Sequence, residues 1–331
     1  MRAIKKILVA VKKPGVGQAA TLRKAAQLAL GMGAELELFH ALTTPIYLGP
    51  IPGDDTGEDW RKTRDREQQL AVQRLERSAA RLRRSGAKVS VKAVWDYPGY
   101  SALLRRAHQS GAGMIVAERH AGGHAAPWLL RYTDWELLRQ SPVPVLLVKK
   151  SRPWKKPAIL AGLDPFHEFA KPANLDREIL ALGGALAGAL GGTLHAAHVY
   201  LAPALRAAEG ASGRALMEAY QRRARDQAEA ALRRELKGAA IPPRQLHLVP
   251  GQPADELPRL VRSVGADIAV MGAVSRTGLK RMVVGNTAEA VFDALACDIL
   301  VVKPAGFRSK VPSRVQGPAF VLPPDAGVPW V

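Results

Sequence analysis

One segment of the chain, residues 270–289, holds residue types that suit an anion. Gly272 permits a close approach of the backbone, and Gly285, Asn286 and Thr287 bring unpaired N–H groups and a hydroxyl to the start of an expected helix. The positive end of a helix dipole favours a phosphate at such a point. Asn286 is also a common residue at a helix start, so a plain helix cap is the alternative interpretation.

The segment belongs to the second of two similar halves of the chain. The apolar run Ile7–Val11 recurs as Ile159–Leu163, and Gly111–Val116 recurs as Gly265–Val270, 154 positions later. Such self-similarity is typical of two copies of one structural unit. We therefore expect a domain over residues 1–150, a second domain over residues 151–304 and a proline-rich tail over residues 305–331.

Short apolar runs alternate with longer helical patterns in each half. This alternation indicates βαβ units, hence an α/β fold with a parallel sheet and helices on both faces. The expected strands are residues 7–11, 34–41, 88–95, 113–117, 143–149, 158–163, 192–200, 244–249, 267–271 and 298–303. Because ligands in such sheets bind beyond the carboxyl ends of strands, a loop that follows residues 267–271 is well placed for a site.

Composition limits the class of protein. With 331 residues, of which 47% are hydrophobic and 23% charged, the chain has the composition of an ordinary globular protein of about two domains. No stretch reaches the ~18 uninterrupted apolar residues of a membrane span, and the start lacks the features of a signal peptide. The single Cys297 cannot form an internal disulfide, and its apolar surroundings predict a buried thiol. These features predict a cytoplasmic protein.

The net charge of +19 is the unusual number, and it comes from 48 Lys and Arg against 29 Asp and Glu. Many arginines fall in an expected helix near residues 60–85. A solvated helix face is one interpretation, and a nucleic acid or anionic lipid surface is the other. The tail brings prolines without a helical or strand pattern, so we expect it to be extended and weakly ordered, or to lie over one half.

With these residues in view, the segment resembles the nucleotide loop of the universal stress protein family. ATP-binding members of that family carry Gly-x2-Gly-x9-Gly-Ser/Thr after the fourth strand. The spacing is kept here by Gly272, Ser275, Gly285 and Asn286, with Thr287 next. The similarity extends over both halves, and the doubled architecture resembles the tandem, E-type members.

The resemblance implies a nucleotide site in the second half. Asp164, at the end of the first strand of that half, would lie near ribose and base, and the backbone of Val199 would meet adenine. The residues implied around the phosphates are Gly272, Ser275, Arg276, Gly285, Asn286 and Thr287. A divalent cation such as Mg²⁺ would neutralise part of the phosphate charge. Ser275 and Asn286 depart from the family pattern, which has glycine and Ser/Thr there.

The first half is an internal control, because its corresponding loop has the same length. Glu118, Ala121, Arg131 and Tyr132 replace Gly272, Ser275, Gly285 and Asn286, and Lys12 replaces Asp164. All glycines of the motif are gone, and Glu118 would bring a negative charge toward the phosphates. We therefore expect no nucleotide in the first half.

The resemblance further implies the strand order 3-2-1-4-5 in each half, and two halves packed as a pseudo-dimer with the fifth strands facing each other. It implies an ATP-binding stress-response protein with a sensor role, and no catalytic group is found. No metal site is predicted, because Gly122 and Gly123 argue against a helix that would align His120 and His124, and no nearby cysteine or series of acidic residues completes a zinc set. The alternatives are a carrier of lipid-like or other apolar molecules, and a binder of nucleic acid or anionic surfaces. Association with a second copy of the chain stays open.

Overall fold

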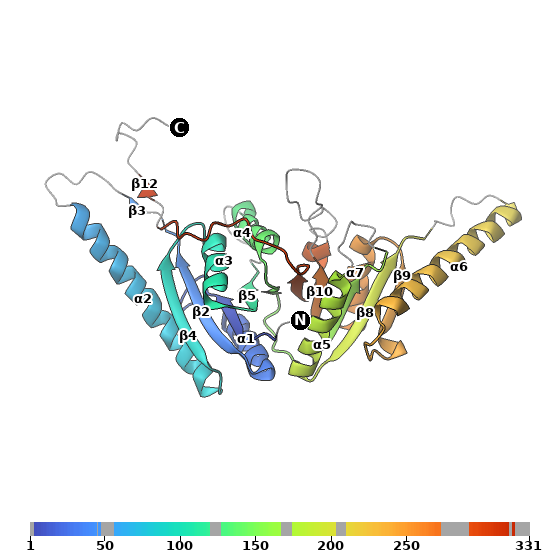
Figure 1. The fold of residues 1–331 in the computed structure, drawn as a ribbon, viewed down its shortest axis with the longest axis horizontal. Helices are drawn as coiled ribbons and strands as arrows, with labels where there is room; N and C mark the ends of the chain where they lie inside the picture. The colour runs from blue at the N-terminus through green and yellow to red at the C-terminus, as the bar shows by residue number, and fades with distance from the viewer. Residues whose placement is uncertain are drawn as a thin grey trace, which may run out of the picture. The chain divides into compact units, whose positions relative to one another are not determined.

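The computed structural model describes residues 3–44, 46–47, 56–119, 127–166, 174–202, 210–272, 291–317 and 320–321. The chain forms two compact units (Figure 1). One unit contains Ile4–Gln140 together with Lys310–Val331, and the other contains Met1–Ala3 together with Ser141–Ser309.

The first unit is built on four parallel strands in the order β4-β2-β1-β5. Their bounds are β1 (Lys6–Ala10), β2 (Glu35–Leu42), β4 (Val89–Trp95) and β5 (Met114–Glu118). The helices are α1 (Ala19–Met32), α2 (Thr56–Arg84), α3 (Gly99–Ser110) and α4 (Pro127–Gln140). Two short strands, β3 (Ile46–Tyr47) and β12 (Phe320–Val321), pair with each other in parallel.

The second unit holds six strands in the order β6-β11-β10-β7-β8-β9. Their bounds are β6 (Val145–Val148), β7 (Ala158–Leu163), β8 (Thr193–Tyr200), β9 (Leu246–Pro250), β10 (Ile268–Gly272) and β11 (Asp298–Val302). The helices are α5 (Leu175–Leu190), α6 (Gly210–Glu235) and α7 (Pro253–Val264), with a 3-10 turn at Pro243–Gln245. All neighbouring strands are parallel except β6 and β11, which are antiparallel.

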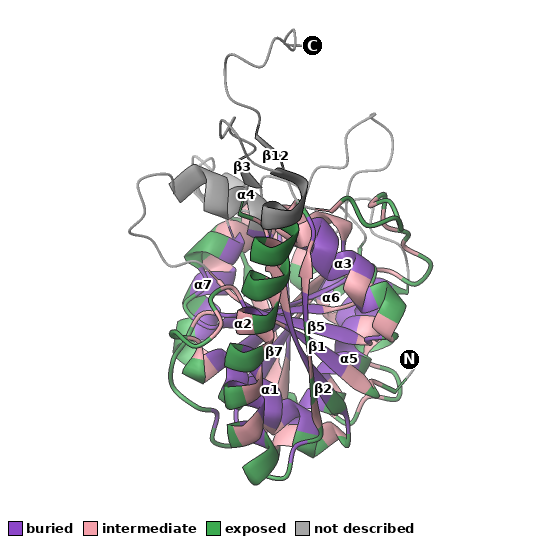
Figure 2. Ribbon diagram, turned by 90° about the vertical axis from the view of Figure 1, so that its left-hand side faces the viewer, coloured by how far each residue is buried: buried purple, intermediate pink, exposed green. Residues whose placement is uncertain are grey.

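The central strands form the core because both faces of a parallel sheet are covered. All five residues of β11 are buried, and the three middle residues of β1 are buried as well. Figure 2 shows buried residues concentrated on the strands and on the sides of the helices that meet them. The continuous apolar runs that marked these strands in the sequence therefore correspond to full burial.

The predicted α/β fold with a parallel sheet and covering helices is confirmed. Each expected strand lies within two residues of an observed one. The order β9-β8-β7-β10-β11 is the order 3-2-1-4-5 expected for the second half. The expected meeting of the fifth strands is also observed, since Leu146 of β6 pairs with Leu300 of β11. Because of this pairing, β6 lies in the second compact unit, and the units divide at Ser141.

A buried carboxylate holds the connection between β6 and β7. Asp298, at the start of β11, is fully buried. Its Oδ1 accepts the backbone N–H groups of Lys149 at 2.7 Å and Lys150 at 2.9 Å, and its Oδ2 accepts Nε1 of Trp154 at 3.0 Å. Hydrogen bonds to an ionised acceptor are about twice as strong as neutral ones. Asp298 thus ties the end of β6 and the following connection to β11.

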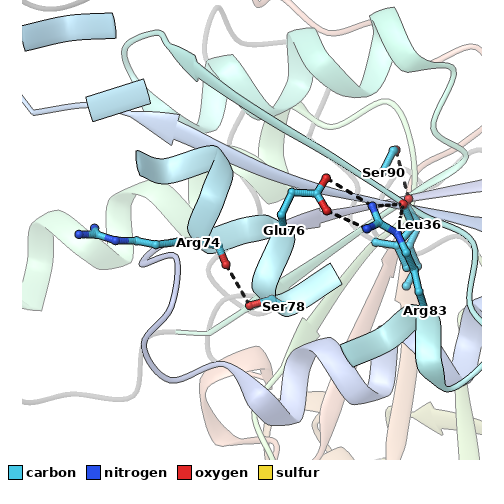
Figure 3. A network of polar contacts seen from close by, with 7 residues as sticks. Leu36, Arg74, Glu76, Ser78, Arg83 and Ser90 are labelled. Atoms are coloured by element: carbon cyan, nitrogen blue, oxygen red, sulfur yellow. Dashed lines mark hydrogen bonds and ion pairs between the residues drawn. The ribbon is translucent and has the colours of Figure 1, made fainter. Parts of the chain in front are cut away.

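Arginines of α2 take part in the packing of the first unit. The guanidinium of Arg83 pairs with Glu76, Nη1 to Oε2 at 2.7 Å, and donates to the carbonyl of Val89 at the start of β4 (Figure 3). The hydrogen bond with Glu76 raises the pKa of Arg83. Ser90 on β4 in turn donates to the carbonyl of Leu36 on β2. This part of the basic face therefore holds the end of α2 against the sheet edge.

None of the described helices has the length and apolar character that a crossing of a lipid bilayer requires.

We predict that Asp298→Asn lowers the free energy of unfolding by about 1–3 kcal/mol in urea titrations. Asparagine has one acceptor oxygen, so one of the three donors would face its NH₂ group and stay buried without a partner. Asp267→Asn is the matched control, because Asp267 is exposed and accepts the N–H of Ala158 through one carboxylate oxygen, which an amide oxygen can still do. We expect a change within about 0.5 kcal/mol for the control. Equal effects of the two changes would contradict the anchoring role of Asp298.

We predict that Cys297 of the folded chain resists thiol reagents. The side chain is buried, and burial, with a smaller effect of Asp298, raises the pKa of its thiol to about 12. Only the thiolate reacts, so alkylation at pH 8 should be at least about a hundredfold slower in the folded chain than in urea-unfolded chain. Mass spectrometry of iodoacetamide-treated samples measures both rates. Rapid native-state labelling would show that the thiol is accessible.

Candidate functional site

The described part of the site lies at the carboxyl ends of three neighbouring strands of the second unit. Asp164 directly follows β7, Val199 is the penultimate residue of β8, and Gly272 ends β10. β7 lies between β8 and β10, and Leu163 pairs with His198. Neighbouring strands are about 4.8 Å apart, so these positions share one edge of the sheet. The topology therefore places these three positions at one edge of the sheet.

Asp164 presents a carboxylate that its surroundings leave partly unused. Its backbone N–H is held by the carboxylate of Asp176, at 3.3 Å from Oδ1 and 3.2 Å from Oδ2. Its own Oδ2 is buried and has no hydrogen-bond partner among the residues that the structure describes. A buried acceptor without a donor costs about 1–3 kcal/mol, so a hydroxyl or N–H group placed there would be stabilised.

Asp176 was not anticipated from the sequence. It lies in the first turn of α5 and is fully buried, although acidic residues rarely are. Its carboxylate fixes the direction in which the chain leaves β7. The only sequence signal was an acidic residue in the first turn of a helix, which also suits an exposed position beside the helix dipole.

Gly272 is required by the packing of α5 as well as by its position at the edge. A Cβ atom at this residue would lie 2.6 Å from Cδ2 of Leu175 and 3.4 Å from Cδ1 of Ile179. The absence of a side chain thus lets the end of β10 approach the first turn of α5. A substitution of Gly272 would disturb this contact, so its effect on binding would be mixed with an effect on folding.

Matching histidines support the corresponding strand ends of the two halves. Nδ1 of His198 donates to the carbonyl of Leu163 at 3.2 Å, and Nδ1 of His40 donates to the carbonyl of Val11 at 2.7 Å. Burial lowers the pKa of His40. Phe166, 39% exposed, lies with its ring centroid 5.6 Å from that of His198. The second half therefore adds a partly exposed aromatic ring close to the edge, a feature the sequence did not single out.

Other predicted residues lie outside the described part of the chain. These are Ser275, Arg276, Gly285, Asn286 and Thr287 of the second half, and His120, Ala121 and His124 of the first, while Arg131 and Tyr132 are described only as part of helix α4.

The first half fills the corresponding place with its own side chain. Nζ of Lys12 donates to the carbonyl oxygen of Glu118 at 2.8 Å and to Oδ1 of Asp134 on α4 at 3.2 Å. Lys12 follows Val11 as Asp164 follows Leu163, so a bound ammonium stands where the second half has a carboxylate. The carbonyl at the end of β5 and the carboxylate of α4 are both engaged by this ammonium. The strands of the two halves follow the same order, but the side chains at this point have opposite charges.

Comparison with known proteins agrees with the twofold organisation. The model of the universal stress protein family matches residues 3–149 and 172–303. Universal stress protein E of Escherichia coli strain K12 is 28% identical over 237 residues, which cover 69% of this chain and 72% of that protein. The Universal stress protein E homolog of Haemophilus influenzae is 29% identical over 219 residues, covering 64% of this chain and 69% of that protein.

Solved structures show the same fold over nearly the whole length. A putative universal stress protein from Pseudomonas aeruginosa UCBPP-PA14 is 26% identical, with a TM-score of 0.67, and the match covers 91% of this chain and 94% of that one. The family match spans most of both halves. The chain therefore belongs to the universal stress protein family.

Proposed function

We propose that the second half binds an adenine nucleotide, ATP with Mg²⁺ as the counter-ion of its phosphates, at the carboxyl edge formed by Asp164, Val199 and Gly272. The observation that carries this proposal is the buried Oδ2 of Asp164, which lacks a partner among the described residues. A ribose hydroxyl is a donor of the right kind, since a hydroxyl gives one hydrogen to an ionised carboxylate.

The remaining parts of the site are assigned by the family resemblance. The backbone of Val199 would contact adenine, and the partly exposed ring of Phe166 offers an apolar face for the base. The phosphates would be held by the segment that begins at Gly272 and includes Ser275, Arg276, Gly285, Asn286 and Thr287. The N–H groups of a glycine-containing loop and of a helix start are suited to phosphate oxygens.

The first half is proposed to bind no nucleotide in this manner. The ion pair between Lys12 and Asp134 occupies the place in the first half that corresponds to Asp164 in the second, where we propose that a ribose binds. A nucleotide entering there would have to displace the ammonium from two oxygen partners. The proposed role of the protein is thus regulatory binding by one half of a pseudo-dimer, in the stress response typical of the family.

We predict that isothermal titration of the full chain with ATP and Mg²⁺ gives one site, and that Asp164→Lys weakens binding by about tenfold or more. The change removes the acceptor for the ribose hydroxyl, and hydrogen bonds to charged groups contribute about 1.5–3 kcal/mol. A lysine at this position also copies Lys12 of the first half, with Asp176 close by as a partner for the ammonium.

The matched control is Asp226→Lys on the exposed side of α6, which alters the net charge by the same amount. Its affinity for ATP should equal that of the unmodified chain. Absence of heat in the unmodified chain would remove the nucleotide proposal. Equal binding by Asp164→Lys and the control would place the nucleotide elsewhere.

A further inference from the structure

The first half carries a buried ion pair at its carboxyl edge that the nucleotide proposal does not use. Asp96 directly follows β4, and Arg105 lies on α3. Nε of Arg105 donates to Oδ2 of Asp96 at 2.8 Å, and Nη2 donates to Oδ1 at 2.6 Å. Both side chains are only 2% exposed. Such a bidentate pair is rigid, and its remaining donors and acceptors need partners because they are removed from water.

The main chain of the tail supplies these partners. Nη1 of Arg105 donates to the carbonyl of Pro312 at 3.3 Å, and the N–H of Gln316 donates to Oδ1 of Asp96 at 3.1 Å. The N–H of Lys310 donates to Oε1 of Gln140 at 3.3 Å. Further along, β12 of the tail pairs with β3. Of the two expectations for the tail, its described residues therefore show the second, a segment that lies over one half.

The hydrogen bonds described above hold the tail by its main chain. The side chains of Pro312, Ser313, Arg314, Val315 and Gln316 are all exposed, and that of Val315 is 50% exposed. The ion pair thus offers one donor to the carbonyl of Pro312 and one acceptor to the N–H of Gln316, four residues further along the tail. Recognition through the main chain tolerates different side chains.

The second half lacks this arrangement. Arg259 is the seventh residue of α7, as Arg105 is the seventh of α3. The side chain of Arg259 is 66% exposed and pairs with Glu256 on its own helix. Gly251 follows β9 where Asp96 follows β4. Because Gly251 provides no carboxylate, Arg259 does not form a buried pair like that of Arg105 and stays mostly exposed.

We propose that the carboxyl edge of the first half is a binding surface for a peptide main chain, and that residues 310–317 of the same chain are its resident occupant. In open parallel sheets this edge is where ligands bind. In the first half, the side chain of Lys12 occupies the position that corresponds to Asp164 of the second half. At the same edge of the sheet, Asp96 and Arg105 bind the main chain of the tail. The inference does not depend on nucleotide binding by the second half.

Amide hydrogen exchange on the full chain tests this proposal. The amides of Lys310 and Gln316 should exchange at least about tenfold more slowly than those of an unstructured peptide of the same sequence. Gln316→Pro removes the N–H that Asp96 accepts and should bring residues 310–317 close to the unprotected rate. Gln316→Ala keeps the N–H and touches only an exposed side chain, so it should keep the protection.

Two further variants test recognition by the main chain. Replacement of Ser313, Arg314 and Val315 by alanine should leave the protection unchanged. Arg105→Lys keeps a positive charge beside Asp96 but has one side-chain nitrogen in place of three, so it cannot bind both Asp96 oxygens and the carbonyl of Pro312, and the protection of residues 310–317 should fall. The proposal is overturned if residues 310–317 of the unmodified chain exchange at the unprotected rate, if Gln316→Pro and Gln316→Ala behave alike, or if the alanine variant releases the tail.

Discussion

Hydrogen bonds to the carboxylate of Asp298 hold the segment that connects the two halves of the sequence. The carboxylate is fully buried and accepts hydrogen bonds from two backbone N–H groups after β6 and from the indole of Trp154. A buried charge is tolerated only when its oxygens are fully used, so this carboxylate requires the chain to pass over it in one way. The antiparallel pairing of β6 with β11 follows from the same geometry, because the two strands meet just before the anchored connection.

The two halves show how one backbone can present opposite chemistry. The same histidine-to-carbonyl hydrogen bond supports β2 in the first half and β8 in the second. The residue after the accepting carbonyl differs in charge between the halves. It is Lys12 in the first half and Asp164 in the second. Lys12 is satisfied by Glu118 and Asp134 within its own half, whereas Asp164 keeps a buried oxygen without a described partner. The two halves thus differ in chemistry at this point without a difference in the order of their strands.

The arginines of this basic chain have different physical roles. Arg105 lies buried against Asp96, and Arg83 pairs with Glu76 while donating to the edge of the sheet. Arg259 remains mostly exposed and pairs with Glu256 of its own helix. The net charge of +19 is therefore a sum over arginines in different environments, and it is not the charge of a single basic surface. Whether the arginine at this helix position is buried depends on a single residue after the neighbouring strand. Asp96 provides a carboxylate that pairs with the guanidinium in the first half, and Gly251 provides none in the second.

The sequence by itself determined the fold class, the twofold repeat and the positions of the strands, because alternating apolar runs and repeated landmarks reflect local periodicity and full burial. It also located Asp164, Val199 and Gly272 at strand ends, and it identified the first half as lacking the glycines of the nucleotide loop. Only the tertiary structure showed why Asp176, Asp298 and the Asp96–Arg105 pair are buried. Their partners are distant in the sequence or are backbone groups, and no local pattern distinguishes a buried carboxylate from an exposed one. The contact of the tail with the first half was decided in the same way, since hydrogen bonds to the main chain leave no signature in the identities of the side chains.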